Sequence, residues 1–147
     1  MTTMSVRLRG IAGTGAALGL AGSHPVVVDR PDGKAGGQGL GFNGGQLLAM
    51  AIGGCFWNDM HYVADEMGIR LESAAVDVTV IFEGTPLRAV AAVLRVSIEA
   101  KDADADIGRL IHRAETLSTV SNSITRGFPV TVGVSGEDGS VASAPAP

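Results

Sequence analysis

The chain has 147 residues, of which 46% are apolar and 18% are charged, so it can bury a core of its own and is not a disordered segment. Its net charge of −4 argues against a nucleic-acid partner, which requires a basic surface, and against docking on an anionic membrane. The single cysteine, Cys55, excludes an internal disulfide, and a free thiol suits the reducing cytoplasm, where we expect the protein to reside.

Neither a secretory signal nor a membrane span is expected. Residues 1–10 contain two arginines but no apolar stretch of the kind that a signal peptide needs. Residues 40–58 are uncharged, but their continuous apolar part, residues 47–57, is about half as long as a membrane-spanning helix. A buried core helix is the better interpretation of this stretch.

The N-terminal part of the chain predicts short strands separated by glycine. Val6 and Leu8 alternate with arginines, which is the period of a strand with one wet face. Residues 16–20 and 26–29 predict two further strands, and the glycine-rich residues 31–41 predict a loop.

A long helix is predicted from about Gly44 to Met67. Asn43 is suited to cap its start, with Gln46 as the reciprocal partner, and Gly68 is suited to end it in the left-handed conformation. The first half of this helix is apolar nearly all round and is predicted to be enclosed on every side. The second half carries acidic residues and is predicted to have one wet face.

The rest of the chain predicts two strands, two helical segments and a last strand. In order, these are strands at 76–82 and 94–98, a helix capped by Asp104 or Asp106, a helical turn at 118–126 ending at Gly127, and a strand at 130–134. Residues 135–147 are small and polar and predict a flexible tail. The sequence therefore predicts one α+β domain over residues 1–134.

Patterns for metals and cofactors fail on spacing. The three histidines lie far apart in sequence and are expected at surface or half-buried positions, and the acidic run before the second helix lacks the glycine and the glutamate of a calcium loop. The glycines near the N-terminus do not have the spacing of a dinucleotide fingerprint. We expect no metal and no cofactor. The residues concerned are His24, His61, His112, Asp102, Asp104, Asp106, Gly13, Gly15 and Gly19.

Cys55 stands out because Gly53 and Gly54 precede it inside the helix, at a cost of roughly 1 kcal/mol each relative to alanine. Such a cost suggests close helix packing or open space beside the thiol. An inert core cysteine is favoured on these grounds alone, since free cysteine is often buried. A reactive thiol would need a nearby cation, because the thiolate is the nucleophile. The candidates are Arg9, Arg30 and Arg126.

The residues around Cys55 resemble the signature of the OsmC/Ohr family. The match is carried by residues 43–56 (Asn-Gly-Gly-Gln-Leu-Leu-Ala-Met-Ala-Ile-Gly-Gly-Cys-Phe) and by Met67-Gly68-Ile69 at the predicted helix end. Residues 120–127 are similar to the second motif of the family, and the resemblance runs from about Val26 to Val134. It implies an OsmC/Ohr-like α+β fold, with a long central helix packed on antiparallel sheets in an intertwined homodimer.

The resemblance also implies a chemistry. Members of the family reduce organic hydroperoxides: a cysteine on the central helix becomes a sulfenic acid, a second cysteine closes a disulfide, and an external thiol reopens it. An arginine and a glutamate tune the first thiol, and apolar side chains accept the substrate.

Carried over by position, the resemblance makes Cys55 the peroxidatic cysteine. Ser118 stands at the position of the second cysteine and Thr119 at that of its proline, while Gly44 and Gly45 replace the proline and glutamate at the helix start. Arg9 is the nearest candidate for the family arginine. Without a second cysteine, a sulfenic acid on Cys55 would need an external thiol or a cysteine of the other subunit.

Three hypotheses follow. The first is a divergent thiol peroxidase of the oxidative stress response, with Cys55 in an apolar substrate pocket and an external thiol as reductant; the pocket residues are Phe42, Phe56, Trp57 and Met60. The second is a non-catalytic homologue that binds an apolar small molecule near Cys55. The third is a site rebuilt for other chemistry with Asp59, His61 or Ser118.

Overall fold

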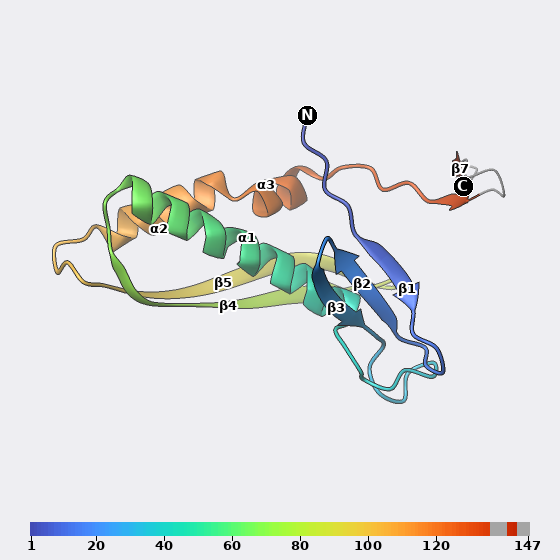
Figure 1. Ribbon diagram of the computed structural model, residues 1–147. Helices are drawn as coiled ribbons and strands as arrows, with labels where there is room; N and C mark the ends of the chain where they lie inside the picture. Colours follow the sequence, from blue (N-terminus) through green and yellow to red (C-terminus); the bar gives the residue numbers. More distant parts are fainter. Residues whose placement is uncertain (136–140, 144–147) are drawn as a thin grey trace.

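The computed structural model describes residues 1–135 and 141–143 and has the predicted α+β architecture with antiparallel sheets (Figure 1). No helix among these residues combines the length and the apolar character needed to cross a bilayer. The elements, in chain order, are β1 (Arg7–Gly10), β2 (Ala17–Ala21), β3 (His24–Val28), α1 (Gly44–Glu66), β4 (Leu71–Glu83), β5 (Arg88–Ala100), α2 (Ile107–Leu117), α3 (Thr119–Arg126), β6 (Gly133–Ser135) and β7 (Val141–Ser143).

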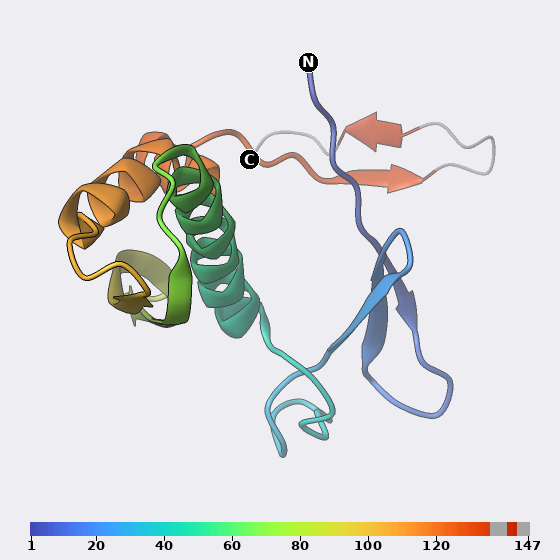
Figure 2. The ribbon, with the colours of Figure 1, turned by 60° about the vertical axis from the view of Figure 1, so that its left-hand side comes forward.

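Strands β1, β2 and β3 form an antiparallel sheet that stands apart from the helices. Figure 2 shows α2, α3 and the β4–β5 ribbon on one side of α1 and this N-terminal sheet on the other. The sheet makes little contact with α1, β4 or β5. Its link to the helical part is the segment before α1, in which Phe42 pairs with Val28 at the edge of β3. A sheet of this size needs a covering layer to be stable, and the other described residues do not provide one.

The glycine-rich loop after β3 is closed by one carboxylate. Asp29 is buried, and its side chain accepts hydrogen bonds from the backbone N–H groups of Arg30 at 2.8 Å, Gln38 at 3.0 Å and Leu40 at 3.2 Å. The N–H groups of Gln38 and Leu40, followed by that of Arg30, hold the pKa of Asp29 below its ordinary value of 3.8, because they stabilise the ionised form.

The ends of α1 are those predicted. The side chain of Asn43 accepts from the N–H of Gln46, and the side chain of Gln46 accepts in return from the N–H of Asn43. Gly68 adopts a φ of +67°, the left-handed conformation that ends the helix. These local hydrogen bonds fix where the helix begins and ends.

The prediction that the first half of α1 is enclosed on every side is wrong for the single chain. Ile52 and Phe56 are buried, but Met50 is 50% exposed and Trp57 is 38% exposed. The β4–β5 ribbon, α2 and α3 cover one side of the helix, and nothing in the described residues covers the apolar side chains on the other.

Helix α1 packs on the β4–β5 ribbon at a glycine. A Cβ atom at Gly53 would lie 2.7 Å from Cγ2 of Val78, so only glycine allows this close approach. Both strands extend beyond the predicted limits, to Leu71–Glu83 and Arg88–Ala100. The core lies between this ribbon, α1 and α2; its buried members are Phe56, Met60, Val63, Ala64, Leu110 and Ala114.

Helices α2 and α3 follow each other almost without a break. Asp106 caps α2 by accepting a hydrogen bond from the N–H of Arg109 at 2.9 Å. It is one of the two aspartates that the sequence offers as the cap. Arg113 of α2 forms an ion pair of 2.6 Å with Glu66 at the end of α1. Helix α3 ends at Gly127 with a φ of +70°. The ion pair, together with the packing of Leu110 and Ala114 in the core, holds α2 against the second half of α1.

The last predicted strand begins later than expected. Val130 and Val132 precede β6 and are exposed, and the strand covers Gly133–Ser135, where it pairs with β7. β7 falls inside the predicted tail, whereas residues 136–140 and 144–147 lie outside the described residues. The domain limits of 1–134 and 135–147 stay a prediction.

Replacing Asp29 by Asn should make the unfolding of the protein less sensitive to acid. A carboxylate with a lowered pKa stabilises the fold above its unfolded pKa of 3.8, and this contribution is lost as the pH falls through the lower folded pKa. The measurement is the urea midpoint from about pH 6 down to about pH 2.5. Asp32→Asn, an exposed change in the same loop, is the control. Identical pH profiles for wild type and Asp29→Asn would contradict this role.

Candidate active site around Cys55

Cys55 lies on the side of α1, next to the ridge of buried residues (Phe56, Met60 and Val63) that packs into the core. Its side chain is half-buried, and its Sγ donates a hydrogen bond to Oδ2 of Asp59 at 3.4 Å. Residues four apart lie one above the other on a helix, so α1 alone holds the two groups together. The thiol is therefore neither sealed in the core nor free in solvent.

Asp59 is also half-buried, and among the described residues the thiol of Cys55 is its hydrogen-bond partner. The other acidic residues of α1 differ, since Asp65 is exposed and Glu66 is held by Arg113. Helix α1 contains no lysine or arginine. The electrostatic surroundings of the thiol on its own helix are thus set by one carboxylate.

The three predicted cations lie elsewhere in the chain. Arg9 is exposed on β1 and donates to the carbonyl of Leu8, and Arg126 is exposed at the end of α3. Arg30 donates to the carbonyl of Gly15 at 3.2 Å and lies 3.7 Å from Asp29. In the described part of the chain none of the three forms a hydrogen bond with Cys55 or an ion pair with Asp59. The role of Arg9 stays a prediction.

Neither of two cavities in the described part of the chain is lined by all four predicted pocket residues. Phe56 is buried beside a cavity, Met60 is fully buried in the core, and Trp57 lies over a shallow depression on another face of α1. Phe42 pairs with β3 and lies beside neither. The sequence shows that all four side chains are apolar, but it does not show which element each of them faces.

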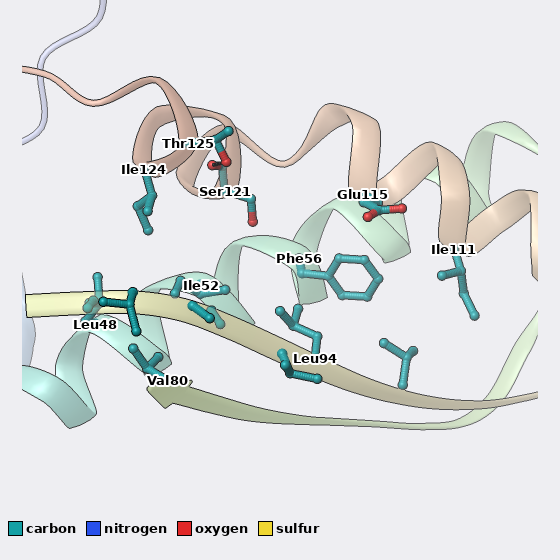
Figure 3. Close-up of a pocket in the computed structure, with 16 residues that line it drawn as sticks. Leu48, Ile52, Phe56, Val80, Leu94, Ile111, Glu115, Ser121, Ile124 and Thr125 are labelled. Carbon is teal, nitrogen blue, oxygen red and sulfur yellow. Dashed lines mark hydrogen bonds between the residues drawn. The ribbon is translucent and has the colours of Figure 1, made fainter. Parts of the chain in front are cut away.

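A cavity of about 730 Å³ lies between α1, β5 and helices α2 and α3 (Figure 3). Leu48, Ile52 and Phe56 form its wall on α1, at a spacing of four residues that predicts a common face. Its polar groups come from α2 and α3. They are Glu115, Ser121 and Thr125. Cys55 is not part of the lining.

The two glycines before Cys55 have different surroundings. Gly53 permits the close packing on β4, whereas no atom lies within 4 Å of a Cβ placed at Gly54. Both glycines, with Met50 and Trp57, border the shallow depression of about 400 Å³. The ring of Trp57 lies 5.2 Å from that of His61. Close packing and open space, the two alternatives from the sequence, thus both occur.

The histidines are exposed, as expected. His112 approaches Glu115 at 3.9 Å, and His24 and His61 lie on other elements. In the part of the chain that the structure describes, no group of three or more histidine, cysteine, aspartate or glutamate side chains could hold a metal ion.

The positions that correspond to the family glutamate and second cysteine are well packed. A Cβ at Gly45 would lie 3.2 Å from the ring of Phe82 and 3.3 Å from the side chain of Asn43, so a larger residue would displace them. Ser118 is fully buried between α2 and α3 and donates to the hydroxyl of Ser121 at 3.2 Å. Both positions have structural roles here.

A long helix that carries a half-buried thiol, packed on an antiparallel ribbon, defines the class of this protein as an α+β domain with a cysteine on its central helix. The model of the OsmC-like protein family matches residues 36–133, so the chain belongs to the OsmC-like family. No curated protein matches this sequence.

Solved structures share the fold. An OsmC-like protein of unknown function from Vibrio cholerae has a TM-score of 0.71 and 12% identity, over 84% of this chain and 94% of that one. An organic hydroperoxide resistance protein OsmC from Legionella pneumophila has a TM-score of 0.63 and 23% identity, over 84% and 90%. The organic hydroperoxide resistance protein OhrB of Bacillus subtilis has a TM-score of 0.56 and 23% identity, over 86% and 92%.

Met60→Ala should lower the free energy of unfolding by about 2–5 kcal/mol, because the side chain is fully buried among core residues. Urea unfolding measures this loss. Met4→Ala makes the same chemical change at a position that is 91% exposed and should cost less than about 0.5 kcal/mol. Equal small losses in both variants would contradict the placement of Met60 in the core.

Proposed function

We propose that this protein is a divergent, thiol-dependent reductase of organic hydroperoxides. It uses Cys55 as its reactive group and acts as a homodimer. The observation that carries the proposal is the half-buried thiol of Cys55, which is in contact with a carboxylate on the open flank of the central helix. Membership of the OsmC-like family supports it. Such an activity would serve the oxidative stress response, in a reducing compartment such as the cytoplasm.

The reaction needs one sulfur atom and no metal or cofactor. The sulfur of Cys55 attacks the terminal oxygen of the hydroperoxide, the O–O bond breaks, and the products are a sulfenic acid and an alcohol. Sulfur loses two electrons and the peroxide gains them. Apolar surface beside the thiol suits the organic part of the substrate.

An external thiol must complete the cycle, since the chain has no second cysteine. One reductant molecule condenses with the sulfenic acid to give a mixed disulfide and water. A second reductant molecule attacks this disulfide, which releases the oxidised reductant and restores the thiol of Cys55. Ser118 cannot take the place of a resolving thiol, because a hydroxyl does not form a disulfide.

Exposed apolar surface supports a second copy of the chain as partner. The accessible surface is 10,936 Å², whereas a compact monomer of 14.9 kDa would expose about 7,000 Å². Large apolar side chains are exposed on β1, α1, the β4–β5 turn and the segment before β6; among them are Leu8, Met50, Trp57, Leu87 and Val130. Burial of such surface between copies is typical of obligate homodimers.

The protein should therefore be a dimer in solution, as sedimentation equilibrium would measure. Trp57→Glu places a charge on the apolar face of α1 and should shift the equilibrium towards monomers, because a buried unpaired charge is costly. Ala103→Glu, in an exposed loop between β5 and α2, should leave the dimer unchanged. A wild type that sediments as a monomer at high concentration would contradict the dimer.

Cys55→Ser should abolish the reduction of cumene hydroperoxide in the presence of a dithiol, because serine cannot form a sulfenic acid. Wild type should turn over, and brief exposure to peroxide should give a sulfenic acid on Cys55 that dimedone traps and mass spectrometry locates. Asn58→Ser, an exposed change on the same helix, should retain the activity. Equal turnover in wild type and Cys55→Ser would eliminate the enzyme.

A non-catalytic binding protein is the second candidate. The cavity of about 730 Å³ favours it, because its apolar lining could hold a small molecule without the participation of Cys55. An apolar fluorescent probe that binds equally to wild type and Cys55→Ser, with no peroxide turnover by either protein, would support this alternative.

A further inference from the structure

We infer that Asp59 is the proton relay of the Cys55 reaction: it takes the thiol proton and delivers it to the leaving alkoxide. The inference rests on the proposed function and assigns to this site a second chemical group. It starts from the hydrogen bond of 3.4 Å between Sγ of Cys55 and Oδ2 of Asp59.

The surroundings of Asp59 leave its carboxylate available for this task. Other carboxylates are bound by N–H groups or by an arginine: Asp29 accepts hydrogen bonds from three backbone N–H groups, and Glu66 pairs with Arg113. Within the described residues, Asp59 has no such N–H or guanidinium partner and is hydrogen-bonded to the thiol alone. Because Asp59 is half-buried, its carboxylate faces less competition from water than an exposed group would.

The helix holds the relay in place. A separation of four residues stacks the two side chains on one face of α1, in the middle of an element whose ends are both capped. The helix alone therefore keeps the carboxylate of Asp59 close to the thiol of Cys55, without help from other elements. A general base or acid has to be positioned in this way before its proton affinity matters.

The step balances as follows. The S–H proton of Cys55 passes to the carboxylate of Asp59 while the sulfur attacks the terminal oxygen of the hydroperoxide. The electron pair of the broken O–O bond goes to the alkoxide oxygen, which takes the proton from Asp59. Cys–SH and ROOH thus become Cys–SOH and ROH, and Asp59 is again a carboxylate.

The relay predicts a dependence on the leaving group, which separates it from a structural role. An alkyl hydroperoxide leaves as a basic alkoxide that needs a proton, whereas peracetic acid leaves as acetate, which does not. Asp59→Asn should therefore slow the oxidation of Cys55 by tert-butyl hydroperoxide by roughly 100-fold. Its oxidation by peracetic acid and its alkylation by iodoacetamide lose only the help of Asp59 with the thiol proton, and they should therefore fall much less.

The rates are measured by quenching and mass spectrometry of the Cys55 peptide. Asp65→Asn, an exposed change of the same kind on the same helix, should leave all three rates unchanged, and Asp59→Glu should restore part of the hydroperoxide rate. A selective loss in Asp59→Asn with rescue by glutamate supports the relay.

Two outcomes overturn the relay while leaving the enzyme in place: equal hydroperoxide rates in wild type and Asp59→Asn, or an equal fall with all three reagents. A wild type that does not react with any hydroperoxide overturns the proposed function and the relay together. Urea unfolding of each variant establishes that the fold is retained.

Discussion

The structure depends on the packing of α1 against the β4–β5 ribbon on one side only. Gly53 lets the helix approach Val78 closely, and the ridge of Phe56, Met60 and Val63 then meets α2 and the ribbon in a single core. Because the ribbon, α2 and α3 all lie on this side, the apolar residues of the opposite side have no partner among the described residues. One helix thus has two apolar faces, a packed one that holds the chain together and one that is exposed.

The position of the thiol follows from this division. Cys55 lies at the boundary between the buried ridge and the open side, which explains its partial burial. A cysteine one step further into the ridge would be an inert core residue, and one on the far side would be as exposed as Met50 and Trp57. The geometry of a single helix therefore sets both the access to the sulfur and its contact with Asp59.

The sequence predicts well what depends on neighbours within a few residues. The capping of α1 by Asn43, its end at Gly68 and the capping of α2 by Asp106 all follow from backbone geometry, and all three are found. Layer assignment is harder, because periodicity gives the angle of a side chain around the helix but not the element that covers it. For this reason the sequence predicts Met60 in a pocket, whereas its side chain lies in the core.

Part of the candidate site can be predicted from the sequence. The spacing of four residues between Cys55 and Asp59 predicts a shared helix face, whereas the lack of a competing cation depends on where Arg113 and the other arginines lie in three dimensions. Gly45 against Phe82 and Ser118 against Ser121 show why a missing family residue need not leave a gap. A side chain at position 45 would press on Phe82 and Asn43, and the buried hydroxyl of Ser118 already has a hydrogen-bond partner. Within the described residues, the group in hydrogen-bond contact with the thiol is the carboxylate of Asp59 on its own helix.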